Sequence, residues 1–334
     1  MTTIVTITTD TSIGVDASAS DTKYVIAAGV DITPALGSAI NASGEASSRS
    51  FEIDGHLGGE VGIQVGADSK PVSSAHITVG SGAVIDATFS GIQATAAKIA
   101  ITNHGEIAST FGLFGTGDAV SVENTGTVLG LIGGAILEGK HLSLVNSGTI
   151  QGGLGFGLSM HSAVGGTSTL HNSGSIGGTT TAVYGGAGAD TFVNSGSVTG
   201  AVMLSQGNDV FEGTGGKVDS IVDGGAGQDV LKGGGHADFF TGGTGHDVLT
   251  GRAGADVFIF STNFDADTIT DFHASGKNAD VVDLSDMKNF DTFSDLSGHM
   301  HQDGKDAVLN FGHGDVLTLH DVDFHDLSKD DFLF

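Results

Sequence analysis

Aspartate recurs every nine residues in one stretch of the chain, at Asp229, Asp238, Asp247 and Asp256. Residues 224–259 read as four tandem units, GGAGQDVLK, GGGHADFFT, GGTGHDVLT and GRAGADVFI. In each unit a glycine-rich half, suited to a turn with positive φ, precedes the aspartate, and a short apolar triplet follows it. Such units cannot fold alone, so we expect them to stack as a flattened coil of about 18 residues per turn, with successive coils ~4.8 Å apart.

This stacking predicts two rows of carboxylates, with Asp229 over Asp247 on one edge and Asp238 over Asp256 on the other. Like charges about 5 Å apart repel by roughly 1 to 3 kcal/mol per pair, so a cation is expected between them. Carboxylates and glycine carbonyls form an all-oxygen donor set, which suits calcium better than zinc or a transition metal. A phosphate-binding loop is disfavoured because no Lys-Ser/Thr follows the glycines. Turns with solvated aspartates and no metal are the alternative.

The four units resemble the GGxGxDxUx nonapeptide of the RTX (repeats-in-toxin) calcium-binding β-roll proteins. This resemblance implies that each calcium ion lies between two successive turns and is held by backbone carbonyls of the glycine half and by the aspartate. Two units depart from the pattern, with His236 at the fourth position of one and Arg252 at the second position of another. About four to six ions are expected from the number of turns.

The residues expected to hold calcium through this resemblance are aspartates and turn glycines. The aspartates are Asp190, Asp209, Asp229, Asp238, Asp247, Asp256, Asp265, Asp267 and Asp271. The glycines are Gly185, Gly186, Gly188, Gly207, Gly224, Gly225, Gly227, Gly233, Gly234, Gly242, Gly243, Gly245, Gly251 and Gly254. Asp190 is expected to stack with Asp209, Asp229 and Asp247, and an 18-residue step from Asp247 makes Asp265 the residue that closes this row. Asp267 or Asp271 is expected to complete the last site.

A second and looser repeat precedes these units. The pattern N-x-G-x-apolar recurs at Asn103, Asn124, Asn146, Asn172 and Asn194, with spacings of 21, 22, 26 and 22 residues. One such turn per coil, preceded by alternating strands, predicts a parallel β-solenoid with three strands per coil. Stacked asparagines are expected to hydrogen-bond to their copies above and below. Because one Asp turn and one N-S-G-like turn share each coil near residue 200, the solenoid is expected to run unbroken into the β-roll.

These patterns divide an all-β chain into four regions. We expect an N-terminal β cap over 1–50, a parallel β-solenoid over 51–184, a calcium-binding β-roll over 185–260, and a C-terminal β cap over 261–334. The resemblance implies that this last region also carries a type I secretion signal, and the chain ends in acidic and then hydrophobic residues, DDFLF. A closing β-strand is the alternative for this segment.

The composition limits the partners that the chain can have. The net charge is −27, the chain has 56 glycines and no cysteine, and 25 of its 39 acidic residues fall in 185–334. Such acidity disfavours nucleic acid and anionic surfaces unless calcium bridges them. No stretch reaches the roughly 18 apolar residues of a membrane span. The N-terminus has no basic and apolar pattern of a cleaved signal peptide, so the resemblance implies export by type I secretion machinery to an extracellular or cell-surface location.

The sequence lacks the motifs of common enzymes. It contains no HExxH, no GxSxG and no Walker loop. With two Tyr and two Arg residues it is also poor in the side chains that a uronate-processing β-helix would need. Asp86, Glu106, Asp118 and Glu123 are the acidic residues whose convergence would indicate glycosidase chemistry.

We therefore expect a secreted, calcium-dependent structural protein without enzymatic activity. It would fold outside the cell and self-assemble as a homo-oligomer or a higher assembly in a surface layer, matrix or filament. Cell-surface polysaccharide, bridged by calcium, is a further expected partner. The alternative is a carbohydrate-active or carbohydrate-binding β-helix protein.

Overall fold

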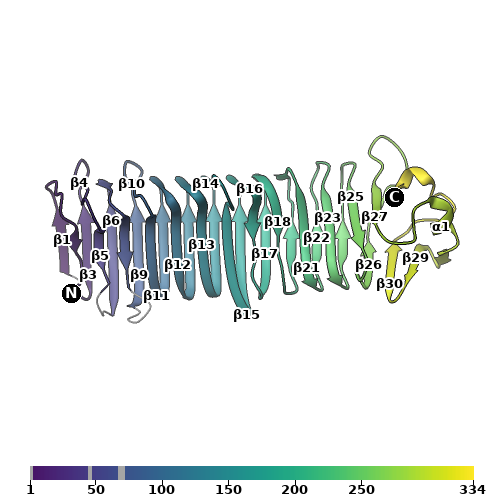
Figure 1. Cartoon of the computed structure of the whole chain (residues 1–334), viewed down its shortest axis with the longest axis horizontal. Coiled ribbons are helices and arrows are strands. Elements are labelled where there is room, and N and C mark those ends of the chain that lie inside the picture. Colours follow the sequence, from purple (N-terminus) through teal and green to yellow (C-terminus); the bar gives the residue numbers. More distant parts are fainter. Residues whose placement is uncertain (1–2, 44–46, 67–71) are drawn as a thin grey trace.

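A computed structural model describes residues 3–43, 47–66 and 72–334, so residues 1, 2 and 44–46 of the expected N-terminal cap and residues 67–71 of the expected solenoid lie outside the described part. The chain forms a parallel β-solenoid of about 13 turns, drawn as a straight rod in Figure 1. This confirms the all-β solenoid predicted from the repeats. None of the described helices has the length and apolar character that a membrane span requires.

The solenoid begins with short strands and ends its N-terminal half with long strands that bend around the corners of the coil. The strands of this half are β1 (Thr3–Ile7), β2 (Val15–Asp16), β3 (Thr22–Ile26), β4 (Asp31–Ile32), β5 (Ser38–Ala42), β6 (Ser48–Ile53), β7 (His56–Leu57), β8 (Val61–Val65), β9 (Val72–Val79), β10 (Val84–Asp86), β11 (Ser90–Asn103), β12 (Glu106–Asn124), β13 (Thr127–Asn146), β14 (Thr149–Gly152), β15 (Leu158–Asn172) and β16 (Ser175–Tyr184).

The C-terminal half consists of shorter strands and a terminal cap. Its elements are β17 (Ala189–Asn194), β18 (Ser197–Met203), β19 (Val210–Glu212), β20 (Lys217–Val218), β21 (Ile221–Gly227), β22 (Val230–Lys232), β23 (Phe239–Gly245), β24 (Val248–Thr250), β25 (Val257–Ser261), β26 (Ala266–Ile269), β27 (Val281–Asp286), α1 (Phe293–Ser297), β28 (Met300–Asp303), β29 (Asp306–Gly312), β30 (Asp315–Leu319), a 3₁₀ helix (Lys329–Asp331) and β31 (Phe332–Leu333).

Parallel pairing between successive coils builds three sides. The first side runs through β4, β7, β10, the starts of β12 and β13, β14, β16, β18 and β20. The second side runs from β2 through β5, β8 and the long strands to β21, β23, β25, β27 and β31. The third side runs from β1 through β3, β6, β9 and the long strands to β17, β19, β22, β24, β26 and β30.

The first side ends at β20, so the three-sided solenoid becomes a two-sided roll without a break in pairing. The change follows from coil length, because the asparagine spacing of 21 to 26 residues gives way to aspartate spacings of 18 to 20. The solenoid therefore continues into the roll, as expected. At the N-terminal end the parallel pairing already includes β1, β3 and β6, so it passes residue 50 without interruption.

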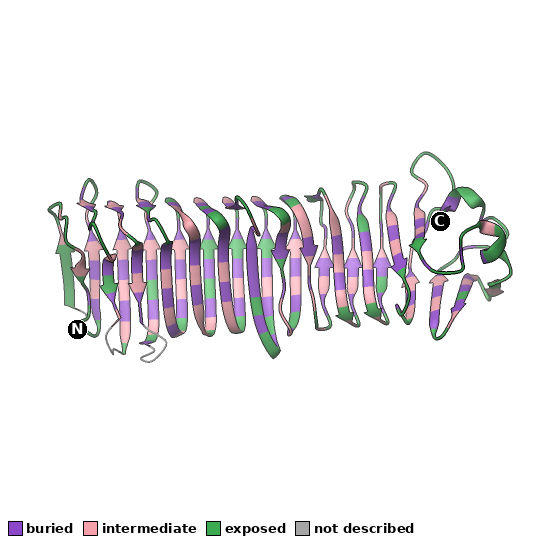
Figure 2. Cartoon of the chain, in the orientation of Figure 1, coloured by how far each residue is buried: buried purple, intermediate pink, exposed green. Residues whose placement is uncertain are grey.

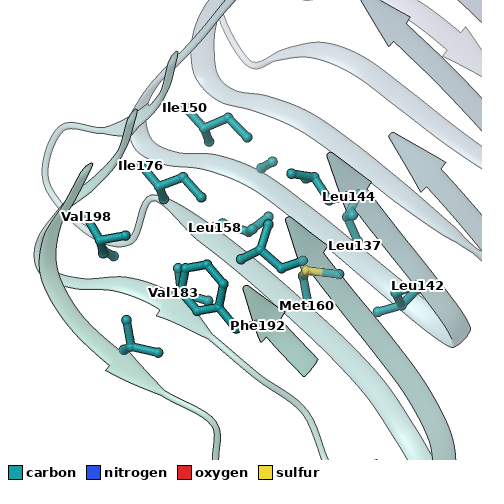
Figure 3. Packing of buried hydrophobic residues seen from close by; sticks show 14 of the residues in the cluster. Leu137, Leu142, Leu144, Ile150, Leu158, Met160, Ile176, Val183, Phe192 and Val198 are labelled. Atoms are coloured by element: carbon teal, nitrogen blue, oxygen red, sulfur yellow. The ribbon is translucent and has the colours of Figure 1, made fainter. Parts of the chain in front are cut away.

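Columns of identical or similar side chains fill the interior. On the third side, Leu170, Phe192, Phe211, Leu231 and Leu249 lie on one another in successive coils, and each is at most 2% exposed. Buried and exposed residues alternate along many of the strands, as a half-buried strand requires (Figure 2). Figure 3 shows the same packing at the change from long to short coils, where apolar side chains from both halves meet.

The predicted asparagine ladder is present at the corner between the third and the first side. The Nδ2 of Asn103 donates to the Oδ1 of Asn124 over 2.8 Å, and the same bond links Asn124 to Asn146, Asn146 to Asn172 and Asn172 to Asn194 over 2.8, 2.8 and 2.9 Å. All five residues are at most 2% exposed. An amide can both donate and accept, so one residue type stacks on itself without leaving a polar atom unpaired.

The C-terminal cap covers the last coil. Strand β30 pairs in parallel with β26 on one edge and antiparallel with β29 on the other, and β29 also pairs antiparallel with β28. Antiparallel pairing thus replaces the open parallel edge that a solenoid would otherwise present. The C-terminal β cap expected over 261–334 thus contains β26, β27 and β30, which begin at Ala266, Val281 and Asp315.

The ladder makes the stability of the solenoid sensitive to one amide. Replacing Asn146 by Ala leaves the Nδ2 of Asn124 and the Oδ1 of Asn172 without their partners in a buried corner, which should cost about 2 kcal/mol. We expect a lower midpoint of thermal unfolding by circular dichroism. The neighbouring exposed residue offers a control, because Ser147→Ala should change the midpoint little. Equal midpoints for the two variants would contradict a stabilising role of the ladder.

Candidate metal centre

Two rows of aspartates lie along the two edges of the C-terminal roll, each aspartate at the start of a strand or immediately before it. The first row lies at the starts of the strands of the third side and contains Asp190, Asp209, Asp229, Asp247 and Asp267. The second row precedes the strands of the second side and contains Asp238, Asp256 and Asp280. The glycine half of each unit supplies the turn before the aspartate, and the apolar triplet after it anchors the strand in the core.

Each carboxylate in the first row accepts a hydrogen bond from the coil before it. The backbone N–H of Asp190 donates to the Oδ1 of Asp209 over 2.7 Å, and Asp209 donates in the same way to Asp229 over 2.7 Å. The N–H of Asp229 donates to Asp247 over 2.8 Å, and that of Asp247 donates to Asp267 over 2.8 Å. One oxygen of each of these carboxylates therefore links its aspartate to the aspartate of the preceding coil.

The second row repeats this arrangement over fewer coils. The N–H of Asp238 donates to the Oδ1 of Asp256 over 2.9 Å, and the N–H of Asp256 donates to the Oδ1 of Asp280 over 3.0 Å. Asp280 also accepts the backbone N–H of His273. The stacking of Asp229 with Asp247 and of Asp238 with Asp256 that the nine-residue period predicts is thus present in the structure.

The second carboxylate oxygen is buried without a partner at five positions. Among the described residues, the Oδ2 atoms of Asp209, Asp229, Asp247, Asp256 and Asp267 have no hydrogen-bond partner. All five side chains belong to residues that are at most 1% exposed. A buried carboxylate oxygen without a donor is costly, so these atoms are suited to a hard cation that accepts oxygen ligands.

Three aspartates differ from these five because protein donors satisfy their second oxygen. Asp190 accepts hydrogen bonds from the hydroxyls of Ser162 and Ser168 and from the N–H of Gly186. The Oδ2 of Asp238 accepts the N–H of Gly234 over 2.8 Å, and the Oδ2 of Asp280 accepts the N–H of His273 over 2.9 Å. The donor sets at the start of both rows and at the end of the second row are therefore more complete than those of the other five aspartates.

The glycines before each aspartate leave room for the carboxylate. A Cβ atom at Gly224 would lie 2.5 Å from the Oδ2 of Asp229, and one at Gly242 would lie 2.2 Å from the Oδ2 of Asp247. The second position of each unit has positive φ, 100° at Gly225 and 102° at Gly243. A side chain at the first position would fill the space in front of the carboxylate, so the glycine pattern keeps that space available to a ligand.

The predicted glycines all lie in or beside these turns. Gly185, Gly186 and Gly188 lie between β16 and β17, Gly207 lies between β18 and β19, Gly224, Gly225 and Gly227 end β21, Gly233 and Gly234 lie between β22 and β23, Gly242, Gly243 and Gly245 end β23, and Gly251 and Gly254 lie between β24 and β25. The structure therefore brings their backbone carbonyls to the same two edges as the aspartate rows.

The expectation that Asp265 closes the first row is wrong. The last coil is 20 residues long instead of 18, so Asp247 stacks on Asp267, and Asp265 lies opposite Gly245. Asp265 adopts a φ of 65° and its N–H donates to the Oδ1 of Asp315. Asp271 accepts the N–H groups of Gly251 and Arg252, so its carboxylate caps a turn at the other edge.

Sequence reasoning missed Asp280 and Asp315 as members of this region. Asp280 follows Asp256 after 24 residues, because the loop of residues 271–279 lengthens the coil and breaks the nine-residue period. Its local pattern, Asp-Val-Val, is the aspartate-x-apolar signal of the repeats and could have identified it. Asp315 lies beyond the antiparallel cap, and only the pairing of β26 with β30 places it next to Asp265.

Burial raises the pKa of carboxylates in both rows. It raises the pKa of Asp209, Asp229 and Asp256 to about 7, opposed by the hydrogen bond from the preceding coil and reinforced by neighbouring carboxylates. Burial raises the pKa of Asp267 to about 8, with the charge of Asp247 acting in the same direction. Without a cation, the rows therefore favour protonated carboxyl groups near neutral pH.

An arginine contacts one turn of the second edge. Arg252 holds the second position of its unit with a φ of 68°, and its Nη1 donates to the carbonyl of Gly233 over 2.8 Å. Its Nη2 pairs with the carboxylate of Glu212, two coils away. The guanidinium thus contacts one of the carbonyls that the repeat pattern assigns to a metal.

The four acidic residues considered for glycosidase chemistry are not gathered at one place. Asp86 and Glu106 lie on the first side of neighbouring coils, and all four are exposed. Asp118 and Glu123 lie further along β12, and Glu123 is paired with the third-side residues Thr102 and Val145. This distribution gives no support to an acidic pair acting on a sugar.

The raised pKa values predict how calcium-free protein responds to pH. A carboxyl group whose pKa is higher in the folded chain stabilises that chain fully below its unfolded pKa, and the contribution is lost as pH rises through about 7 to 8. In the presence of a chelator we expect the thermal midpoint to fall by about 5 °C or more between pH 5 and pH 8.5. Saturating calcium should abolish or reverse this trend, because it binds only the deprotonated carboxylates. A midpoint that rises with pH in chelator would contradict the pKa assignment.

Comparison with known proteins identifies the repeats. The sequence matches the family described as RTX calcium-binding nonapeptide repeat (4 copies), over residues 214–249 and 232–269. No curated protein matches the chain.

Among solved structures, the chain is similar to the extracellular lipase LipA from Serratia marcescens, at 18% sequence identity and a TM-score of 0.33. This similarity covers 65% of the chain, and the chain spans 40% of the lipase. The matched residues contain five of the stacked aspartates, Asp229, Asp238, Asp247, Asp256 and Asp267. The chain therefore contains RTX calcium-binding nonapeptide repeats, and these repeats continue a parallel β-solenoid.

Proposed function

We propose that the two aspartate rows hold several calcium ions and that the chain is a secreted structural protein whose fold depends on them. The observation that carries this proposal is the set of five buried Oδ2 atoms without a hydrogen-bond partner, stacked in register along the edges of the roll. The matched RTX repeats support calcium as the cation. We propose a structural and not a catalytic role for the rows.

The ligands that we propose are the free carboxylate oxygens and the carbonyls of the glycine turns. Asp209, Asp229, Asp247 and Asp267 would hold ions along the first edge, and Asp256 would hold an ion on the second. Bound calcium would place positive charge between the carboxylates of successive coils and take the place of the missing hydrogen-bond donors. We propose about four to six ions, since the free oxygens are five in number and each ion lies between two turns.

The dependence on calcium supports folding outside the cell. Sites built from one carboxylate per turn and backbone carbonyls resemble extracellular modules, which bind calcium at about 10⁻⁴ to 10⁻³ M. In a calcium-poor interior, folding would have to bury these carboxylates without a ligand or protonate them, and the chain could remain unfolded for export by type I secretion machinery. Folding at the outer surface would then be driven by the ions.

Self-assembly is the finer part of this proposal. The solenoid exposes apolar side chains, among them Leu131, Leu154 and Val164, at 59%, 72% and 85%. The backbone of Leu154 is bonded to that of Leu131, so the two side chains lie one coil apart. Exposed apolar surface of this kind favours side-by-side packing of rods in a layer, matrix or filament, where calcium could also bridge to cell-surface polysaccharide.

Calcium titration tests the proposal. In chelator the chain should have less β-structure by circular dichroism and a lower thermal midpoint, and both should rise on addition of calcium, with several ions bound per chain by isothermal calorimetry. Asp229→Asn should lower the number of ions bound and lower the midpoint in calcium by about 5 °C. Asp118→Asn removes the same charge from an exposed position in the solenoid and serves as the control. Full β-structure and an unchanged midpoint in chelator would contradict calcium-dependent folding.

The arginine in the second edge predicts a separate effect. Arg252→Gly restores glycine at a position with positive φ but removes a cation from Gly233 and Glu212. In chelator we expect the thermal midpoint of this variant to lie a few degrees below that of the wild type. In saturating calcium the two midpoints should be equal. Lys277→Gly, which removes an exposed positive charge, is the control. A midpoint in chelator above that of the wild type would contradict this prediction. It would mean that relief of backbone strain at residue 252 outweighs the loss of the guanidinium contacts.

A further inference from the structure

The second side of the solenoid carries a hollow on the N-terminal side of the aspartate rows, and Tyr184, which lines it, lies six residues before Asp190. Coil stacking places Phe114, Ile136, Ser159 and Tyr184 in one column, each paired with the next. The flanking residues Leu158 and Met160 belong to the core, where Figure 3 shows their side chains. Since side chains alternate along a strand, Ser159 faces outward between them.

Ser159, His161 and Glu138 form a linked cluster in this hollow. The Oγ of Ser159 lies 3.1 Å from the Nε2 of His161. The Nδ1 of His161 lies 3.8 Å from the Oε1 of Glu138, which is the paired residue one coil earlier. The hydroxyl of Thr116 donates to the other oxygen of Glu138, and the ring of Tyr184 packs edge-on against His161 at 5.5 Å.

The order hydroxyl, imidazole, carboxylate is the arrangement of an activated serine. When Nε2 accepts the Ser159 hydrogen, the remaining ring proton lies on Nδ1 and faces Glu138. A nucleophile within hydrogen-bond reach of a base, with the base oriented by a third group, is the general pattern of acyl transfer on unrelated folds. Ser159 is 4% exposed although it faces outward, because it lies at the floor of the hollow.

The apolar residues around the cluster favour a substrate with an apolar chain. The hollow around Ser159 has a volume of about 380 Å³ and is also lined by Phe156 and by the hydroxyl-bearing Thr180 and Thr181. It shares Ile136 with a second hollow of about 270 Å³, lined by Phe89, Phe111 and Phe114. Phe114 lies two coils from Ser159, so this apolar floor extends roughly 10 Å along the rod.

We propose that Ser159, His161 and Glu138 form an esterase site that accepts carboxylic esters with an apolar acyl chain. The acyl chain lies over Ile136 and Phe114, and the ester carbonyl lies over Ser159. This activity goes beyond the calcium-dependent structural role and uses a different part of the chain.

The reaction balances without a metal or cofactor. The Ser159 Oγ forms a bond to the ester carbonyl carbon, and its proton passes to the Nε2 of His161. His161 then gives this proton to the departing alkoxide, which is released as an alcohol. The acyl group remains bound to Ser159 as an acyl-serine. Water then attacks the acyl carbon, gives its proton to His161, and the acid departs as the proton returns to Ser159. Thr180 and Thr181 line the hollow and supply the hydroxyl donors available to the developing oxyanion.

The test uses calcium-replete full-length protein, a fluorophosphonate probe and p-nitrophenyl octanoate. We expect covalent labelling at Ser159, located by peptide mass spectrometry, together with ester hydrolysis. Ser159→Ala should abolish both, and His161→Ala should slow both by about 100-fold. Glu138→Gln should slow both by about 10-fold or more. Ser121→Ala, an exposed serine that lies on the third side, should change neither.

A specificity readout separates catalysis from a role in folding. Phe114→Ala should raise KM for the octanoate ester by about 10-fold and leave hydrolysis of the acetate ester nearly unchanged. Circular dichroism in calcium shows whether each variant is folded. The calcium dependence of β-structure is measured separately from ester cleavage, so that failure of one proposal does not count against the other. Failure of folded wild-type protein to react with the probe, or equal labelling of Ser159→Ala, would overturn the proposal.

Discussion

In-register parallel stacking is the constraint on which the whole molecule depends. Each coil lies on the next with its residues aligned to their counterparts, from Thr3 opposite Thr22 at one end to Asp247 over Asp267 near the other. At a spacing of ~4.8 Å, each side chain has a similar neighbour above and below. A residue type is therefore tolerated in a stack only if it can pair with copies of itself, or if another group, such as a backbone donor or an ion, satisfies its polar atoms.

Asparagine and aspartate respond to this constraint in opposite ways. The amide of Asn124 donates to Asn146 and accepts from Asn103, so the ladder satisfies itself inside the corner. The carboxylate of Asp229 can only accept, so one oxygen takes an N–H of the preceding coil and the other is left buried without a donor. A change of a single atom, from amide nitrogen to carboxylate oxygen, thus separates the self-sufficient solenoid from the roll, whose buried carboxylate oxygens lack donors.

The same stacking explains why one rod contains two cross-sections. The third side keeps its column of apolar residues from Leu170 to Ile269, and the second side keeps its own, so the core is continuous. The first side ends at β20, where the asparagine spacing of 21 to 26 residues has given way to aspartate spacings of 18 to 20. Asp190 precedes this point, and its carboxylate is bonded to serines and to Gly186, so it joins the self-sufficient part to the part with free oxygens.

Stacking also assembles chemistry that no linear motif contains. Glu138 and His161 come from different coils, and only the pairing of β13 with β15 sets them side by side. A search for sequence patterns around a serine has nothing to detect here, because the spacing between the partners depends on coil length. The column of Phe114, Ile136 and Ser159 has the same origin.

The sequence by itself determined the repeating elements, because the period of the glycines, aspartates and asparagines fixes what stacks on what. From this period alone follow the parallel solenoid, the asparagine ladder and the alignment of Asp229 with Asp247. The tertiary structure decided where the period breaks: the long last coils replace Asp265 by Asp267 and add Asp280, and β30 brings in Asp315. It also decided which carboxylate oxygens are satisfied, since burial and donor geometry depend on neighbours that the sequence does not place.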